Sequence, residues 1–150
     1  MTKAAAETTA PMSDLGLLVI DASVVIAECL PERHSARARE ILVRVAREGG
    51  VVPGLWAIEV GSSLLAAERR GRLRSAERRW LLDRFGRLPI TIDAETWARA
   101  WIESMRLAEE HRLTLYDSTY LELAVRLSLP LATFDVDLQR AAREAGVVLV

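Results

Sequence analysis

The stretch Leu17-Leu18-Val19-Ile20-Asp21-Ala22-Ser23 decides the fold class. Residues 17–20 form an unbroken apolar run, which is typical of a strand with both faces buried. The run ends at Asp21, and a second apolar stretch at residues 24–30 is closed by Pro31, so we expect a short helix there. A buried strand that leads directly into a helix is typical of a parallel α/β sheet.

The rest of the chain continues this alternation. Apolar spacing predicts helices at residues 34–48, 56–70, 75–85, 93–110, 117–127 and 135–145, and strands at 51–53, 88–92, 129–133 and 147–150. The helix at 93–110 is expected to begin at a capping Asp93 and to bury Trp97, Trp101 and Met105. The pattern indicates an α/β fold with a mainly parallel sheet, in which ligands bind beyond the carboxyl ends of the strands.

Length and composition limit the class of protein. The 150 residues suit one domain, expected over residues 15–150 after a disordered tail at 1–14, in which Met12 is an alternative start. No apolar run approaches the ~20 residues that span a bilayer, and the tail lacks the apolar centre of a signal peptide. We therefore expect a cytoplasmic protein without membrane partners. The net charge of −1 argues against a strongly basic protein that coats nucleic acids generally.

Cysteine and histidine are too few to form a zinc site. Cys29 is the only cysteine, and its apolar surroundings predict a small buried residue. Together with the widely separated His34 and His111 it matches no zinc-ligand spacing. A metal ion would need oxygen ligands, which points to Mg²⁺, Mn²⁺ or Ca²⁺.

Four carboxylates stand where this fold places ligands. Asp21 and Asp135 each follow a predicted strand, Asp117 opens a predicted helix, and Glu59 lies in the first turns of another. Each aspartate has an alternative role as a helix N-cap, which is worth ~1 kcal/mol. Glu59 lacks that alternative, because an unpaired carboxylate in an apolar stretch is costly to bury. It needs an arginine partner or a metal ion shared with the other three acids, whose repulsion a divalent cation would remove.

Four short blocks around these acids resemble a known family. In chain order they are Val19-Ile20-Asp21-Ala22-Ser23-Val24, Glu59-Val60 followed by Leu64-Leu65, Tyr116-Asp117-Ser118-Thr119-Tyr120-Leu121, and Leu131-Ala132-Thr133-Phe134-Asp135-Val136-Asp137-Leu138. They look like the blocks of a PIN-domain ribonuclease, and the ending Gly146-Val147-Val148 resembles the VapC toxins of bacterial toxin–antitoxin systems. The resemblance covers about residues 17–150, and four blocks in the right order are more specific than any one of them.

The resemblance implies a fold, an activity and partners. The fold is a three-layer α/β/α sandwich with a central, mainly parallel sheet. The activity is Mg²⁺-dependent endonucleolytic cleavage of RNA by a metal-activated water, with Mn²⁺ able to substitute. Catalysis and metal binding fall to the four acids, and the hydroxyls of Ser23 and Thr133 would orient carboxylates or water. The partners are a cognate antitoxin protein and a second copy in a homodimer.

Two positions differ from the family pattern or add to it. Where the second block often carries Asn three residues after the Glu, this sequence has Ser62, a smaller hydrogen-bond donor. Asp137 is an additional acid beside Asp135, and we rank it second as a cofactor-binding residue because residues two apart at a helix start point in different directions. Its alternative role is a first-turn acid stabilised by the helix dipole.

Arginines provide candidate contacts with RNA phosphates, since the guanidinium fork matches phosphate oxygens. A dense group surrounds the junction of two predicted helices: Arg69, Arg70, Arg72, Arg74, Arg78 and Arg79. Arg112, close in sequence to Asp117, is a second candidate. A solvated helix face is the alternative for the whole group. Trp80, Trp97 and Trp101 fit helix core stripes better than stacking on RNA bases.

Two other functions compete with a nuclease. An Asp/Mg²⁺ phosphatase is suggested by Phe134-Asp135-Val136-Asp137, but such enzymes hold the phosphoryl group with a lysine, and the only lysine here is Lys3 in the tail. A catalytically weak PIN-like scaffold module is the other, although all four acids are present. Metal-dependent cleavage of RNA, with Asp21→Asn and Asp117→Asn as controls, separates these functions.

Overall fold

The computed structural model of the chain describes residues 16–31 and 33–150. The predicted tail at 1–14, the alternative start at Met12 and the domain boundary predicted at residue 15 lie outside these residues. Within the described part, no helix combines the length and the hydrophobicity needed to cross a membrane.

A parallel sheet lies at the centre of the described residues. Its strands are short: β1 (Val19–Ile20), β2 (Gly50–Val52), β3 (Ile90–Ile92) and β4 (Leu131–Ala132). Their order in space is β3-β2-β1-β4, because Val19 pairs with Val51 on one side and with Leu131 on the other. The first strand of the chain is therefore an inner strand, and its residues are fully buried, as predicted for a strand covered on both faces.

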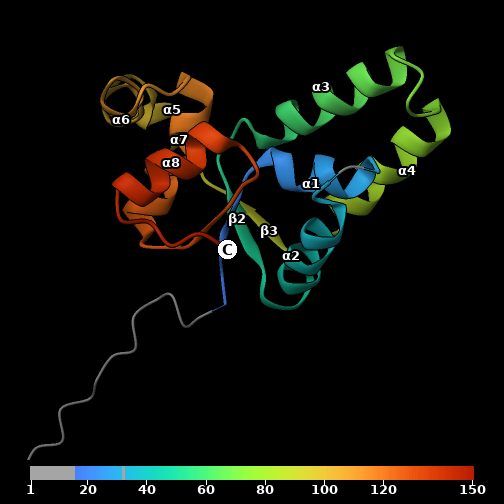
Figure 1. Cartoon of the computed structure of the whole chain (residues 1–150), viewed down its shortest axis with the longest axis horizontal. Helices are drawn as coiled ribbons and strands as arrows, with labels where there is room; N and C mark the ends of the chain where they lie inside the picture. Colours follow the sequence, from blue (N-terminus) through green and yellow to red (C-terminus); the bar gives the residue numbers. More distant parts are fainter. Residues whose placement is uncertain (1–15, 32) are drawn as a thin grey trace, which may run out of the picture.

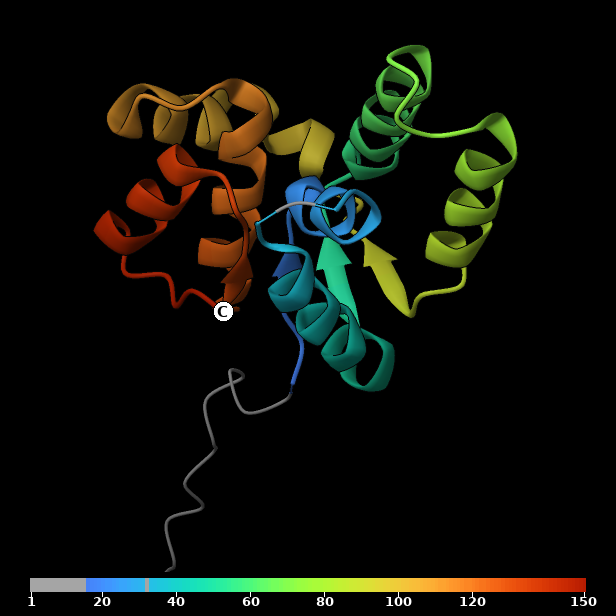
Figure 2. The ribbon, with the colours of Figure 1, turned by 45° about the vertical axis from the view of Figure 1, so that its right-hand side comes forward.

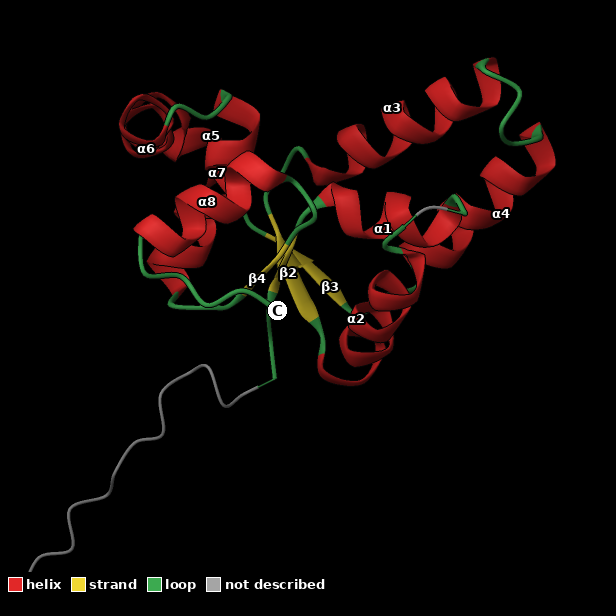
Figure 3. Cartoon of the chain, in the orientation of Figure 1, coloured by secondary structure: helices red, strands yellow, loops and turns green. Residues whose placement is uncertain are grey.

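Helices cover both sides of this sheet. One group contains α1 (Ala22–Cys29), α2 (Ser35–Glu48), α3 (Trp56–Arg69) and α4 (Ser75–Gly86). The other contains α6 (Met105–His111), α7 (Leu115–Leu127) and α8 (Val136–Glu144), entered through α5 (Thr96–Arg99) and the π-helical turn η2 (Ala100–Ser104). Figure 1 and Figure 2 show the two groups on opposite sides, and Figure 3 shows the strands between them. The expected three-layer α/β/α sandwich is confirmed.

The helix predicted at residues 93–110 is broken by the π-helical turn. The prediction that Trp97, Trp101 and Met105 are buried is wrong, because they are 65%, 85% and 37% exposed. A π-helical turn inserts an extra residue and rotates the following side chains around the axis. Thr96 and Ser104 are buried instead, so polar side chains of this segment face the interior while its tryptophans face solvent.

Asp93 does not cap a helix, which corrects a second prediction for this segment. The N-cap position of α5 is Glu95, whereas Asp93 Oδ2 accepts hydrogen bonds from Thr96 Oγ1 at 2.9 Å and from Arg126 Nη2 at 3.0 Å. The ion pair with Arg126 joins the segment after β3 to α7. A half-buried arginine of α7 therefore holds this carboxylate in place.

The last predicted strand, residues 147–150, is reduced to one parallel bridge between Leu131 and Leu149. Leu131 N donates to Val148 O at 2.8 Å, and Val150 N donates to Leu131 O at 3.1 Å.

Two further predictions, on α1 and α4, are corrected. Cys29 is half-buried rather than fully buried, and Trp80 is 62% exposed beside the Arg84 guanidinium.

Candidate functional site

All four predicted acids line one cleft of about 530 Å³ beyond the carboxyl ends of β1 and β4. The acids come from four separate places in the fold: the β1–α1 junction, α3, α7 and the β4–α8 junction. Apolar and hydroxyl side chains complete the lining: Ala22, Ser23, Ile26, Ile58, Ser62, Ser63 and Tyr116. The sheet edge at which ligands were expected to bind is therefore the place where the acids meet.

Asp21 is buried at the end of β1 and is held by two hydroxyl groups. Its Oδ2 accepts hydrogen bonds from Ser23 Oγ at 2.6 Å and from Thr133 Oγ1 at 2.7 Å. Asp21 stands at the N-cap position of α1, yet its side chain makes no capping hydrogen bond. The alternative role of Asp21 as a side-chain cap is therefore wrong.

Asp135 stands at the N-cap of α8, and here the capping role is confirmed. Its Oδ1 accepts from Leu138 N at 2.7 Å, while its own backbone N donates to Thr133 Oγ1 at 3.0 Å. The hydroxyl of Thr133 thus contacts both Asp21 and Asp135. The capping bond uses one carboxylate oxygen, so Oδ2 makes no hydrogen bond within the described part of the chain and is available to a ligand in the cleft.

Asp117 is not a cap either, because α7 begins two residues earlier than predicted. The N-cap is Thr114, whose Oγ1 accepts from Asp117 N at 3.1 Å and donates to Asp117 Oδ2 at 2.7 Å. This reciprocal pair is a variant of the capping box, in which the cap and the third helical residue satisfy one another. It fixes Asp117 in the first turn of α7, facing the cleft.

Glu59 obtains the partner that its apolar surroundings require. The phenol of Tyr120, in α7, donates a hydrogen bond to Glu59 Oε2. Tyr120 is fully buried, so the bond ties α3 to α7 across the floor of the cleft. A neutral donor, rather than the arginine considered from the sequence, satisfies this carboxylate and leaves its negative charge uncompensated.

Burial and mutual repulsion raise the pKa values of these acids. Burial raises the pKa of Asp21, and the charges of Asp117 and Asp135 add to the effect against the hydroxyl bonds that oppose it. Burial also raises the pKa of Glu59 to about 7, aided by Asp21 and Asp117. The pKa of Asp117 is raised by burial and then by Asp135 and Asp137. The cleft therefore concentrates negative charge without a neutralising cation.

The donor set has the chemistry that a hard divalent cation requires. Oxygen ligands on separate elements suit Mg²⁺ or Mn²⁺, and a bound cation would remove the repulsion that raises the pKa values. As the side chains stand, however, no three His, Cys, Asp or Glu residues in the described ranges are arranged around a common point. Each acid instead contacts its own hydroxyl or backbone partner.

Comparisons with known proteins agree with this site and fold. The family model described as "PIN domain" matches residues 18–144. The chain belongs to the PIN-domain family. The protein named Ribonuclease VapC3 of Pyrobaculum aerophilum is 33% identical over 118 residues, which are 79% of this chain and 88% of that protein.

Two solved structures share the PIN-domain fold. The crystal structure of PAE2754 from Pyrobaculum aerophilum has a TM-score of 0.66 at 23% identity and covers 98% of this chain and 93% of its own. The crystal structure of FitAcB from Neisseria gonorrhoeae has a TM-score of 0.60 at 18% identity and covers 89% and 95%. At these identities the likeness concerns the fold alone.

Two more predicted residues lie at the edge of the PIN-domain cleft. Ser62 lines it, one turn along α3 from Glu59. Asp137 does not line it; its side chain is 75% exposed and lies 3.7 Å from Arg140. Its charge nevertheless reaches Asp117, whose pKa it raises. Asp137 is thus placed at the rim, where it adds negative charge.

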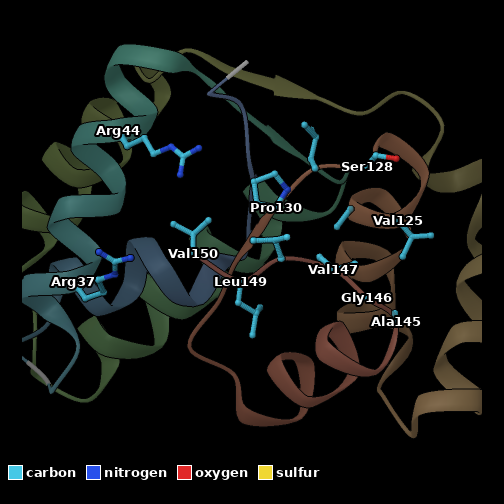
Figure 4. A pocket seen from close by; sticks show the side chains of 13 residues that line it. Arg37, Arg44, Val125, Ser128, Pro130, Ala145, Gly146, Val147, Leu149 and Val150 are labelled. Carbon is cyan, nitrogen blue, oxygen red and sulfur yellow. The ribbon is translucent and has the colours of Figure 1, made fainter. Parts of the chain in front are cut away.

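A larger cavity of about 650 Å³ lies at the other end of β4, next to Pro130 (Figure 4). Arg37 and Arg44 of α2 face the C-terminal residues Leu149 and Val150 across it (Figure 4). No acid lines this cavity, so it cannot offer the oxygen ligands found in the carboxylate cleft.

Sequence reasoning missed the positioning role of two residues, Thr114 and Tyr120. The pattern Thr114-x-x-Asp117 is a detectable signal, since a hydroxyl three residues before an acid is typical of a helix start. Tyr120 gave no such signal, because its bond with Glu59 joins residues 61 positions apart. Only the fold, which brings the first turns of α3 close to α7 beyond the ends of the strands, puts those two side chains together.

Proposed function

We propose that this PIN domain is a Mg²⁺-dependent endoribonuclease and the toxin of a toxin–antitoxin pair. The observation that carries the proposal is the convergence of Asp21, Glu59, Asp117 and Asp135 on one cleft in a chain of this family. The relative named Ribonuclease VapC3 supports RNA as the substrate.

We assign metal binding to the four acids, with one or two Mg²⁺ ions and with Mn²⁺ able to substitute. A bound ion would neutralise charge on the phosphate and activate water at neutral pH. Ser23 and Thr133 hold one oxygen of Asp21, so the carboxylate presents its other oxygen in a fixed direction. Tyr120 does the same for Glu59. These positioning residues reduce the reorganisation that the site needs when substrate binds.

The nucleophile in this proposal is water. It attacks the phosphorus in line and loses a proton to solvent, and the bond to the 3′-oxygen breaks as that oxygen takes up a proton from solvent to give a 3′-hydroxyl. The RNA 2′-OH takes no part, so the products carry 5′-phosphates.

Two protein partners belong to the proposal. The likeness to Ribonuclease VapC3 supports a cognate antitoxin, which could place an arginine among the carboxylates and displace the metal. A homodimer is supported by the exposed apolar surface of Trp97, Trp101 and Ile102, which are 65%, 85% and 73% exposed. Co-purification of a small partner protein from the native host tests the first of these partners.

No observation favours the competing functions. A phosphatase would need a cation beside the acids to hold the phosphoryl group, and no arginine or lysine of residues 16–31 and 33–150 lines the cleft. A scaffold without catalysis would leave the uncompensated carboxylates without a role.

The test is cleavage of a labelled single-stranded RNA by purified protein in Mg²⁺, Mn²⁺ or EDTA. We expect cleavage with either metal and none in EDTA, and loss of activity in Asp21→Asn and Asp117→Asn. Asp83→Asn is the matched control, because Asp83 is an exposed acid of α4 paired with Arg87 and does not line the cleft. Equal activity in all variants would contradict the proposal.

A further inference from the structure

A second hollow, of about 380 Å³, continues from the carboxylate cleft along α3. The two share Ile26, Ser62 and Ser63, so they are joined along one side. The second hollow lies between α1 and α3 and reaches Arg70 and Arg72, at the end of α3. We call it the α1–α3 groove. It leads from a cluster of acids to a pair of arginines.

The lining of the α1–α3 groove is small and carries no acid. Beyond the shared residues, Ala66 and Ala67 form its α3 wall, and Leu30 lies on the α1 side. Serine hydroxyls donate hydrogen bonds to phosphate oxygens, and alanines let a backbone approach the helix closely. The polar groups that an anionic chain meets in the groove are therefore hydroxyls and guanidinium groups, between small apolar side chains.

Arg70, like its neighbour Arg69, has no side-chain partner within the described residues, but of these two only Arg70 lines the α1–α3 groove. Arg74 pairs with Glu77 at 3.1 Å, and Arg78 pairs with Glu68. Within the described residues, Arg70 makes no ion pair and no side-chain hydrogen bond, and its side chain is exposed. Its full charge is available to a ligand, whereas pairing already neutralises Arg74 and Arg78.

We propose that the α1–α3 groove binds the sugar-phosphate backbone of single-stranded RNA on one side of the scissile bond, with Arg70 and Arg72 on its phosphates. The proposal rests on the proposed nuclease function and deepens it by giving the substrate a path. Arg70 lies eleven positions after Glu59, which is ~16 Å along the helix axis. The groove offers phosphate contacts and no base-reading group beyond the serines, so it sets register rather than sequence preference.

The test is equilibrium binding of a fluorescent single-stranded RNA to the full chain carrying Asp21→Asn, measured in Mg²⁺ over a range of salt concentrations. Arg70→Ala is compared with Arg69→Ala, which removes the same charge from the neighbouring exposed residue. Arg69 lines neither hollow and, within the described ranges, also has no side-chain partner. Arg70→Ala should weaken binding about tenfold and lower the salt slope by about 0.7. Arg69→Ala should change both by much less.

Equal losses in the two variants would overturn the proposal, because they would show general charge attraction. An unchanged RNA affinity in Arg70→Ala would overturn it too. If that variant also loses a co-purifying protein partner, the groove binds a protein rather than RNA, and the proposal is equally overturned. The readout is binding, so it stays separate from the proposed function. If the wild-type protein binds RNA through Arg70 but does not cleave it in Mg²⁺, the proposed nuclease activity is contradicted, whereas RNA binding in the α1–α3 groove is supported.

Discussion

Thr133 Oγ1 lies 2.7 Å from Asp21 Oδ2, and the two residues are 112 positions apart in sequence. The same hydroxyl accepts a hydrogen bond from Asp135 N at 3.0 Å. One buried side chain at the end of β4 thus holds the acid at the end of β1 and the backbone of the acid that opens α8. Parallel pairing of β1 with β4 brings these residues together.

Thr133→Val should lower kcat for RNA cleavage by about ten- to a hundredfold, the range found when a partner of a metal ligand is removed. The valine keeps the shape of threonine but cannot orient Asp21. KM should change little, because no substrate contact is lost. Thr133→Ser should restore most of kcat, since it keeps the hydroxyl. Steady-state kinetics check this, and a Thr133→Val protein with wild-type kcat would show that the hydroxyl only fills space.

Metal-free protein should lose stability as the pH rises from about 4.5 through about 7. The folded-state pKa of Glu59 is raised from 4.5 to about 7, so the folded form binds the proton more tightly than the unfolded form does. The contribution of Glu59 to the free energy of unfolding is fully present below its pKa in the unfolded state. It is lost as the pH rises through its pKa in the folded state. Asp21 and Asp117, whose pKa values are also raised, act in the same direction.

Urea unfolding in EDTA at a series of pH values measures this effect. Glu59→Gln should flatten the decline, since the amide does not titrate, and saturating Mg²⁺ should reverse it in the wild type. Comparing the wild type with Glu59→Gln cancels the titration of other groups. A wild-type protein that gains stability relative to Glu59→Gln across this pH range would contradict the sign.

The two strand-end aspartates should differ in their effect on stability. Asp135→Ala should lower the free energy of unfolding by ~1 kcal/mol, because it removes the side-chain cap of α8. Asp135→Asn should retain most of that stability, since asparagine caps as well as aspartate. Asp21→Asn should not destabilise metal-free protein, because it removes a repelled charge that caps nothing. Urea unfolding measures all three, and a larger loss in Asp21→Asn than in Asp135→Ala would contradict the assignment.

Substitution of both exposed tryptophans next to the π-helical turn should dissociate the proposed homodimer. Trp97→Ser with Trp101→Ser removes the apolar side chains that solvent otherwise contacts. Trp80→Ser is the matched control, since Trp80 is 62% exposed on α4. Sedimentation velocity of the three proteins measures the change. Dimers that persist in the double variant, or that disappear in the control, would place the interface elsewhere.

The sequence predicted the sheet and the convergence of the acids because both depend on local signals. Apolar runs marked β1 and β4, and their carboxyl ends meet in any parallel sheet, so Asp21 and Asp135 had to lie close together. Glu59 was identified as needing a partner by its apolar neighbours alone.

The missed features depend on contacts between distant segments or on a change of helical period. Helical spacing assumes 3.6 residues per turn, so it could not place Trp101, which lies within the π-helical turn, or Met105, which follows it. Two contacts arise only from the position of α7 in the fold. They are the hydrogen bond from Tyr120 to Glu59 and the hydrogen bond from Arg126 to Asp93.

The chemistry of the cleaved ends tests the central claim most directly. A defined single-stranded RNA is incubated with wild-type protein and Mg²⁺, and the fragments are analysed for their terminal groups. If water at the carboxylate cleft is the nucleophile, the downstream fragments carry 5′-phosphates and no fragment forms in EDTA or with Asp117→Asn. Fragments with 2′,3′-cyclic phosphates and 5′-hydroxyls, or undiminished cleavage in EDTA, would contradict it.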